Sequence, residues 1–80
     1  MAVVEKNTCK PLIHKDLRST SRIAHVDGDA ATVLRLEGLG LAPGRSVHIE
    51  RKGDPFIVRV YGSRVGLAPR LARSIHVDDD

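Results

Sequence analysis

The side chains of this chain that are best suited to chemistry are one cysteine and four histidines: Cys9, His14, His25, His48 and His76. A single cysteine excludes an internal disulfide and a multi-cysteine zinc site, and the histidines form no HxH or HxxH cluster. His48 and His76 each fall at the outward phase of a predicted strand, so they are the candidate ligands of a weak site for a transition metal, Fe²⁺ or Zn²⁺. Exposed strand histidines that hold no metal are the simpler interpretation, and nothing in the sequence requires a cofactor.

The sequence contains no recognisable catalytic motif. No spacing of Ser, His, Asp or Cys, and no pair of carboxylates, indicates a nucleophilic or general acid–base site, and the GxxxxGK[ST] loop of nucleotide hydrolysis is missing. The residues Gly53, Asp54 and Pro55 are a predicted turn, in which Gly supplies backbone freedom, Asp a local hydrogen bond and Pro the start of the next strand. We therefore expect no enzymatic activity.

Composition limits the chain to one small protein domain with a modest positive charge. Its 80 residues allow a thin core, and 13 Lys+Arg against 10 Asp+Glu give a net charge of +3. Phe56 and Tyr61 are the only aromatic residues, whereas binding of single-stranded nucleic acid uses several stacking aromatics. Nucleic acid is therefore not an expected partner, although a small basic β-barrel that binds it is kept as an alternative. No apolar run approaches the roughly 20 residues of a membrane span and no signal-peptide pattern follows Met1, so the sequence predicts a cytoplasmic protein.

One predicted helix and a sharp corner precede the β-rich half of the chain. Asp29 is placed to cap a helix that runs from Ala30 to about Leu39, with Val33 and Leu36 on its inward face. A left-handed glycine, Gly40, ends the helix. The dipeptide 43–44, Pro43 and Gly44, then supplies a turn before the predicted strand at 45–51.

The remaining segments alternate apolar and polar residues as strands do, at 22–26, 45–51, 56–61, 64–68 and 74–77, with one helical turn at 69–73. These elements predict a mainly β fold, a small partly open β-barrel of about five strands. One α-helix lies between the first and second strands, and a short helical turn comes before the last. We expect a flexible N-terminal arm at 1–11, a barrel domain at 12–78 and an acidic tail at 79–80.

The order of these motifs resembles the FeoA family, the small cytoplasmic ferrous iron transport protein A. The matching residues run from 12 to 78 and comprise Leu39-Gly40-Leu41-Ala42-Pro43-Gly44, Gly53-Asp54-Pro55, Val58-Arg59-Val60-Tyr61-Gly62, Val65-Gly66-Leu67, and Ala72 followed by Ile75-His76-Val77. The chain departs from the family in a shorter segment before Gly53, in Ser19-Thr20 where many members have Pro-Gly, and in Gly38, where a better helix former is usual.

The resemblance implies an SH3-like barrel that acts through protein–protein interaction with FeoB, the GTP-driven ferrous iron transporter of bacterial inner membranes. The chain would then be a non-enzymatic accessory or regulatory protein, a monomer or weak homo-oligomer, that reaches the inner membrane only through the cytosolic GTPase domain of this partner. The same fold forms the C-terminal domain of DtxR-type repressors, so an SH3-like metal-sensing or regulatory module is an alternative. The lack of a preceding helix-turn-helix favours the free-standing form.

Two groups of residues at the turns carry the expected site. Leu39, Leu41, Pro43 and Arg35 are the candidate contacts to the partner, although a helix stop with core packing is the simpler role of the two leucines. The second group is expected to be structural and consists of the turn residues Gly40, Gly44, Gly53, Asp54 and Pro55.

Overall fold

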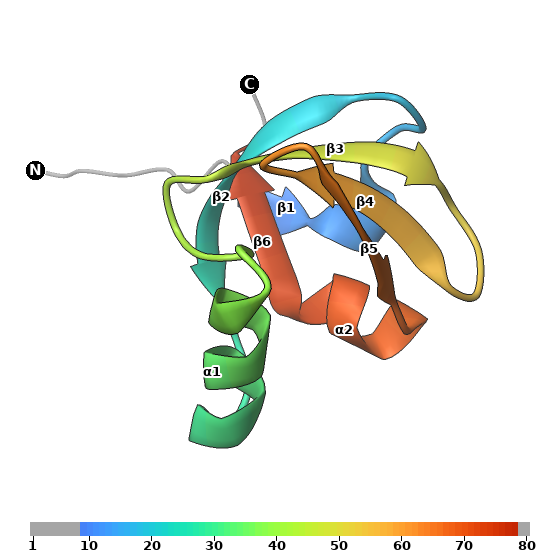
Figure 1. The fold of residues 1–80 in the computed structure, drawn as a ribbon. Coiled ribbons are helices and arrows are strands. Elements are labelled where there is room, and N and C mark those ends of the chain that lie inside the picture. Colours follow the sequence, from blue (N-terminus) through green and yellow to red (C-terminus); the bar gives the residue numbers. More distant parts are fainter. Residues whose placement is uncertain (1–8, 79–80) are drawn as a thin grey trace, which may run out of the picture.

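The computed structural model of the chain describes residues 9–78, in which six strands and three helical segments occur (Figure 1). The strands are β1 (Cys9–Pro11), β2 (Thr20–Val26), β3 (Ser46–Arg51), β4 (Phe56–Val60), β5 (Ser63–Leu67) and β6 (Ile75–Asp78). The helical segments are the 3₁₀ turn η1 (Leu12–His14) and the helices α1 (Ala30–Gly38) and α2 (Pro69–Ser74). Within this range no helix has the length and apolar character of a membrane span.

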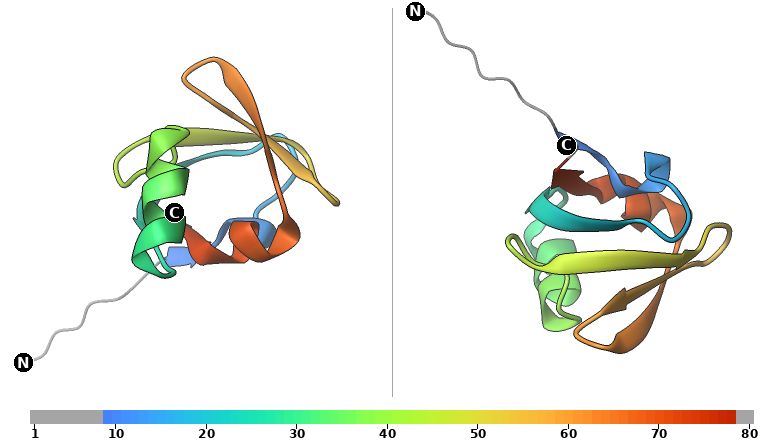
Figure 2. Two further views of the ribbon diagram at one scale, coloured as in Figure 1. Left: turned by 60° about the horizontal axis from the view of Figure 1, so that its bottom comes forward. Right: turned by 90° about the horizontal axis from the view of Figure 1, so that it is seen from above.

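All strand pairs are antiparallel, and the strands follow the order β1-β6-β2-β3-β4-β5 across a single sheet. The first half of β2 pairs with β3 and its second half with β6, so this one strand turns the corner of the sheet. The sheet curves around the core and its two edges, β1 and β5, do not pair with each other (Figure 2). The predicted partly open barrel is therefore confirmed.

The structure has one strand more than predicted. This additional strand is β1, which the sequence-based prediction placed in the N-terminal arm. The expected count was about five strands because Pro11 was taken to interrupt any strand. Pro is tolerated on an edge strand, where one side needs no ladder hydrogen bond, and β1 is a three-residue edge strand beside β6. Consequently α1 lies between the second and third strands. Residues 1–8 of the expected arm and the expected tail at 79–80 lie outside the described residues.

Thirteen buried apolar residues of the range 9–78 form the core: Leu12, Ile23, Leu36, Leu41, Val47, Ile49, Phe56, Val58, Val60, Leu67, Ala72, Ile75 and Val77. The alternating strands place their apolar residues inward as predicted, most clearly β4 with Phe56, Val58 and Val60. No polar or charged residue of the described part of the chain is buried. Any chemistry of the described residues therefore belongs to the surface.

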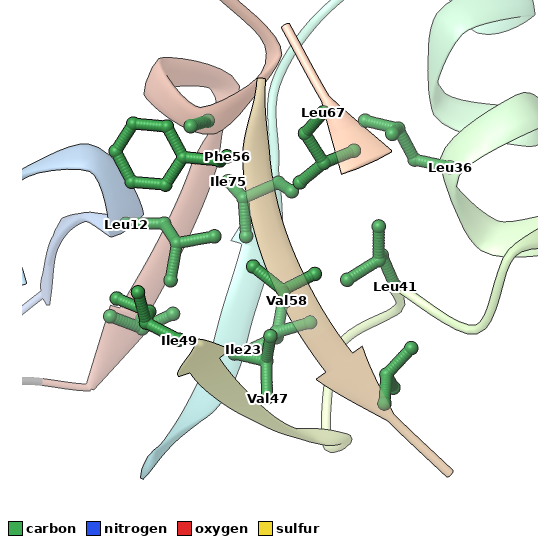
Figure 3. Packing of buried hydrophobic residues seen from close by; sticks show 13 residues of the cluster. Leu12, Ile23, Leu36, Leu41, Val47, Ile49, Phe56, Val58, Leu67 and Ile75 are labelled. Carbon is green, nitrogen blue, oxygen red and sulfur yellow. The ribbon is translucent and has the colours of Figure 1, made fainter. Parts of the chain in front are cut away.

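Helix α1 begins and ends with the predicted caps. The Thr32 amide donates a hydrogen bond of 2.8 Å to Asp29 Oδ1 at the start of the helix. At its end the Gly40 amide donates to the Glu37 carbonyl and the Leu41 amide to the Leu36 carbonyl, both at 2.9 Å. Gly40 has φ of +94°, so this is a Schellman motif with its usual apolar contact. Leu36 and Leu41 both point into the core from this corner (Figure 3).

Candidate functional site

Helix α1 presents most of its surface to solvent. Leu36 is its only buried residue, and the helix lies at one side of the curved sheet (Figures 1 and 2). Leu34 is 67% exposed and Leu39, at the end of the helix, is 46% exposed. Exposed apolar side chains that gather on one element are a common mark of an interaction surface, so α1 is the leading candidate for contact with a partner.

The end of α1 abuts the turn between β4 and β5. That turn consists of Tyr61 and Gly62, with φ of 56° and 76°, the left-handed pair of a type I′ hairpin. The predicted strand 56–61 therefore ends one residue early. A Cβ on Gly40 would lie 3.5 Å from Tyr61 Cδ2, and the Arg45 guanidinium lies 4.7 Å from the centre of the exposed Tyr61 ring. An exposed aromatic ring and a cation thus lie close to the helix end.

The four predicted partner residues differ in their exposure. Leu39, Pro43 and Arg35 are exposed, as a contact surface requires, and their role in binding stays a prediction. Leu41 is fully buried, which corrects the expectation that it contacts a partner. Its side chain closes the Schellman motif against Leu36, and that packing leaves no side-chain surface for another molecule.

The predicted turn residues occupy turns. Gly44 has φ of +92°. The Arg45 amide donates a hydrogen bond to the Ala42 carbonyl at 3.1 Å, and the Gly44 amide donates one to the Ile23 carbonyl at 2.8 Å. The bond from Gly44 to the Ile23 carbonyl ties the turn after α1 to β2. Gly53, Asp54 and Pro55 lie between β3 and β4 and are exposed.

The two predicted metal ligands do not lie together. His48 is on β3 and His76 on β6, and β2 runs between these two strands. His48 Nδ1 is instead 2.8 Å from the Thr20 hydroxyl on β2. The expected pair of His48 and His76 is therefore wrong.

His76 meets a different histidine and a carboxylate from β2 and the turn after it. Its ring stacks on His25 with centroids 4.4 Å apart and planes 12° from parallel. His76 Nε2 lies 2.8 Å from Asp27 Oδ2, and His25 Nε2 lies 3.7 Å from Asp27 Oδ1. Each ring thus directs its own Nε2 toward one of the two carboxylate oxygens of Asp27. We call these three residues the His25–Asp27–His76 cluster.

A β-bulge in β2 creates this cluster. Ile23 pairs with Val77 and His25 with His76, so two residues of β2 span a single step of β6. In a regular ladder Ala24 would lie opposite His76, and His25 would point to the other face of the sheet. The extra residue lets Ile23 and Val26, three apart, both contact the core. That spacing of apolar residues is the one signal in the sequence that could have revealed the cluster.

Asp29, at the start of α1, interacts with Thr32 in the first turn of the helix. Hydrogen bonding from Thr32, first through its side chain and then through its backbone amide, holds the pKa of Asp29 below its ordinary value. The charge of this carboxylate also suits the positive end of α1. Its role is to cap the helix.

Known proteins share this fold. The model of the FeoA domain family matches residues 11–79 of the chain, and no curated protein matches it. A structure of the iron uptake regulatory protein FeoA shares the fold with a TM-score of 0.82 and 22% identity, over 88% of this chain and 96% of that protein.

Two further structures are similar. A zinc-complexed FeoA of Stenotrophomonas maltophilia, described as a prokaryotic SH3 domain protein, matches with a TM-score of 0.75 and 27% identity, over 84% of this chain and 87% of that protein. IdeR of T. acidophilum matches with a TM-score of 0.86 and 26% identity, over 98% of this chain but 37% of IdeR.

These structures confirm the SH3-like fold that the sequence predicted. The family model covers nearly all of the chain, including the helix-end corner, the 53–55 turn and the last strand. This chain belongs to the FeoA family.

Proposed function

We propose that this protein is a non-enzymatic cytoplasmic accessory protein of ferrous iron transport, which binds the cytosolic GTPase domain of a FeoB-type inner-membrane transporter. Membership of the FeoA family supports the proposal. So does the S. maltophilia relative, which is described as a candidate activating factor of bacterial ferrous iron transport. The chain reaches the membrane only through its partner.

The exposed face of α1 is the observation that carries the proposal. Successive residues of a helix are 100° apart, which places Ala30, Ala31, Leu34 and Gly38 on the side opposite the buried Leu36. All four are exposed. One leucine among three small residues forms a low apolar face, which another helix or a loop can approach closely. Leu39 adds a second exposed leucine at the end of the helix, on a different side of it from Leu34.

Direct titration tests the proposal. The full chain is titrated against the purified GTPase domain of a FeoB-type transporter, in the GDP-bound and GTP-analogue-bound states, by biolayer interferometry. We expect saturable binding that Leu34→Asp and Leu39→Asp each weaken about tenfold or more, equivalent to at least 1.4 kcal/mol. Arg35→Ala and Pro43→Ala extend the scan to the other exposed residues of the corner.

Leu17→Asp is the matched control. Leu17 is also an exposed leucine, but it belongs to the loop between η1 and β2, which lies at the far end of the molecule from α1 (Figures 1 and 2). Binding by this variant should equal that of the unaltered chain. A lack of any binding by the unaltered chain contradicts the function, and an equal loss in Leu17→Asp contradicts the surface.

The likeness to IdeR supports a second candidate, an SH3-like metal-sensing or regulatory module as in DtxR-type repressors. On that alternative the chain would bind a repressor's DNA-binding domain and not the GTPase domain. A gel shift at low salt covers the third alternative, a small nucleic-acid-binding barrel, since such affinity would fall steeply as salt rises.

A further inference from the structure

We propose that the His25–Asp27–His76 cluster is a binding site for one divalent transition-metal ion, with Zn²⁺ as the probe of choice. The ligand atoms that the three side chains offer all lie within 4.8 Å of one another. Two imidazoles and one carboxylate form a donor set that zinc and other first-row divalent ions accept. The site shares no residue with the proposed α1 surface, and its test does not depend on the binding of a protein partner.

The backbone holds the three residues in place before any ion arrives. His25 pairs directly with His76 across β2 and β6. The Asp27 amide donates a 2.8 Å hydrogen bond to the Ser74 carbonyl just before β6. Because this pairing fixes all three Cα positions, binding an ion costs little ordering of the backbone.

The side chains retain enough freedom to close around an ion. Ligand atoms around a tetrahedral zinc at 2.0–2.1 Å lie about 3.4 Å apart, so the cluster must contract slightly. The His25 and Asp27 side chains are 50% and 63% exposed and can rotate, whereas His76 at 21% is the more fixed ligand. Nε2 of each histidine already faces the carboxylate, and an ion between them would replace the hydrogen bond between His76 and Asp27. Water completes the coordination on the open side.

The bulge supports a site that is built and not incidental. It turns His25 to the face that His76 occupies while keeping Val26 against the core. Bulges often redirect a side chain beside a functional site. Of the four histidines, His25 and His76 are the two that the structure stacks together, and His48 is held by Thr20.

Calorimetry on the tag-free, full-length chain tests this site. ZnCl₂ is titrated in a non-chelating buffer, and long-range ¹H–¹⁵N spectra follow the histidine rings in the same samples. We expect one ion per chain, with the ring signals of His25 and His76 shifting together. His25→Ala, Asp27→Asn and His76→Ala should each weaken binding by at least the 10-fold to 100-fold that loss of a supporting residue typically causes.

His48→Ala, His14→Ala and Cys9→Ser are the controls, and each should bind Zn²⁺ within about twofold of the unaltered chain. Circular dichroism shows whether each variant remains folded, and the exposed His25 gives the variant least able to disturb the core. Binding by His25→Ala equal to that of the unaltered chain would overturn the proposal. An equal loss of Zn²⁺ affinity in Cys9→Ser or His48→Ala would also overturn it. So would a titration that does not saturate at millimolar Zn²⁺, because the cluster would then be only a structural His–Asp hydrogen bond.

Discussion

Gly38 and Gly40 lie two residues apart at the end of α1, and they differ in backbone conformation and in the space around them. Gly38 is the last residue of the helix and has no positive φ, and a Cβ added there would meet nothing within 4 Å. Gly40 has φ of +94°, and its added Cβ would lie 3.5 Å from both Val60 and Tyr61. The chain's own structure therefore explains Gly40 and gives no reason for Gly38.

Alanine at these two positions should shift stability in opposite directions. Gly38→Ala should raise the free energy of unfolding by about 0.5–1 kcal/mol, because it removes backbone freedom from the unfolded chain. Gly40→Ala should lower it by about 1–2 kcal/mol, the cost of a left-handed residue with a Cβ. Urea denaturation of both variants measures the effect, and a shift of the same sign in both would contradict it.

A Gly38→Ala chain that is more stable yet binds the GTPase domain more weakly would place the contact on the outer face of α1.

At the scale of elements, α1 depends on its caps as well as on its packing. Its one buried residue, Leu36, joins it to the core, and a nine-residue helix is too short to be stable alone in water. The hydrogen bonds at Asp29 and in the Schellman motif therefore hold it in place. Held at its two ends and through Leu36, α1 keeps its outer face exposed.

The cap at Asp29 should make the stability of the protein depend on pH. Because the pKa of Asp29 is lowered in the folded chain, its carboxylate stabilises the fold fully above the unfolded value of about 3.9 and loses that effect as pH falls through the folded value. Asp29→Ala should thus be less stable than the unaltered chain at pH 7. The difference in free energy of unfolding between the two chains should narrow toward pH 3. Urea midpoints at both pH values measure this, and a gap that widens on acidification would refute it.

The strands show which element boundaries a pattern can define. Alternation placed the inward residues of β3, β4 and β6 correctly, because a half-buried strand imposes a period of two on its own sequence. It did not locate β1, whose three half-buried residues carry no such pattern. It also missed the bulge in β2, since the two-to-one step depends on how β6 pairs with it.

At the scale of the whole molecule, stability depends on thirteen apolar residues. A small domain of this kind has a free energy of unfolding of roughly 5–15 kcal/mol, so one core residue represents a large share. Leu36 and Leu41 join α1 to the rest of this core (Figure 3). Loss of either side chain therefore affects the whole fold.

Leu41→Ala should lower the free energy of unfolding by about 2–5 kcal/mol, because it leaves a cavity at a fully buried position. Leu39→Ala is the matched control, and at its exposed position the change should stay within about 0.5 kcal/mol. Thermal denaturation followed by circular dichroism distinguishes the two. Equal effects would mean that the corner is packed differently from the arrangement described above.

Local chemistry accounts for what the amino-acid order predicted well. The helix caps, the glycine turns and the alternating strands follow from φ, ψ and side-chain preferences over a few residues, and their order along the chain was enough to indicate the FeoA family. These features need no knowledge of distant neighbours.

Long-range pairing decided which candidate residues lie at the surface and which lie together. Leu39 and Leu41 look alike in the sequence, yet the Schellman motif buries Leu41 and leaves Leu39 at the surface. His76 meets His25 and not His48, because β2 lies beside β6 and a single extra residue in β2 reverses the direction of His25. Strand order and register join residues about fifty positions apart, and no pattern within either segment encodes that distance.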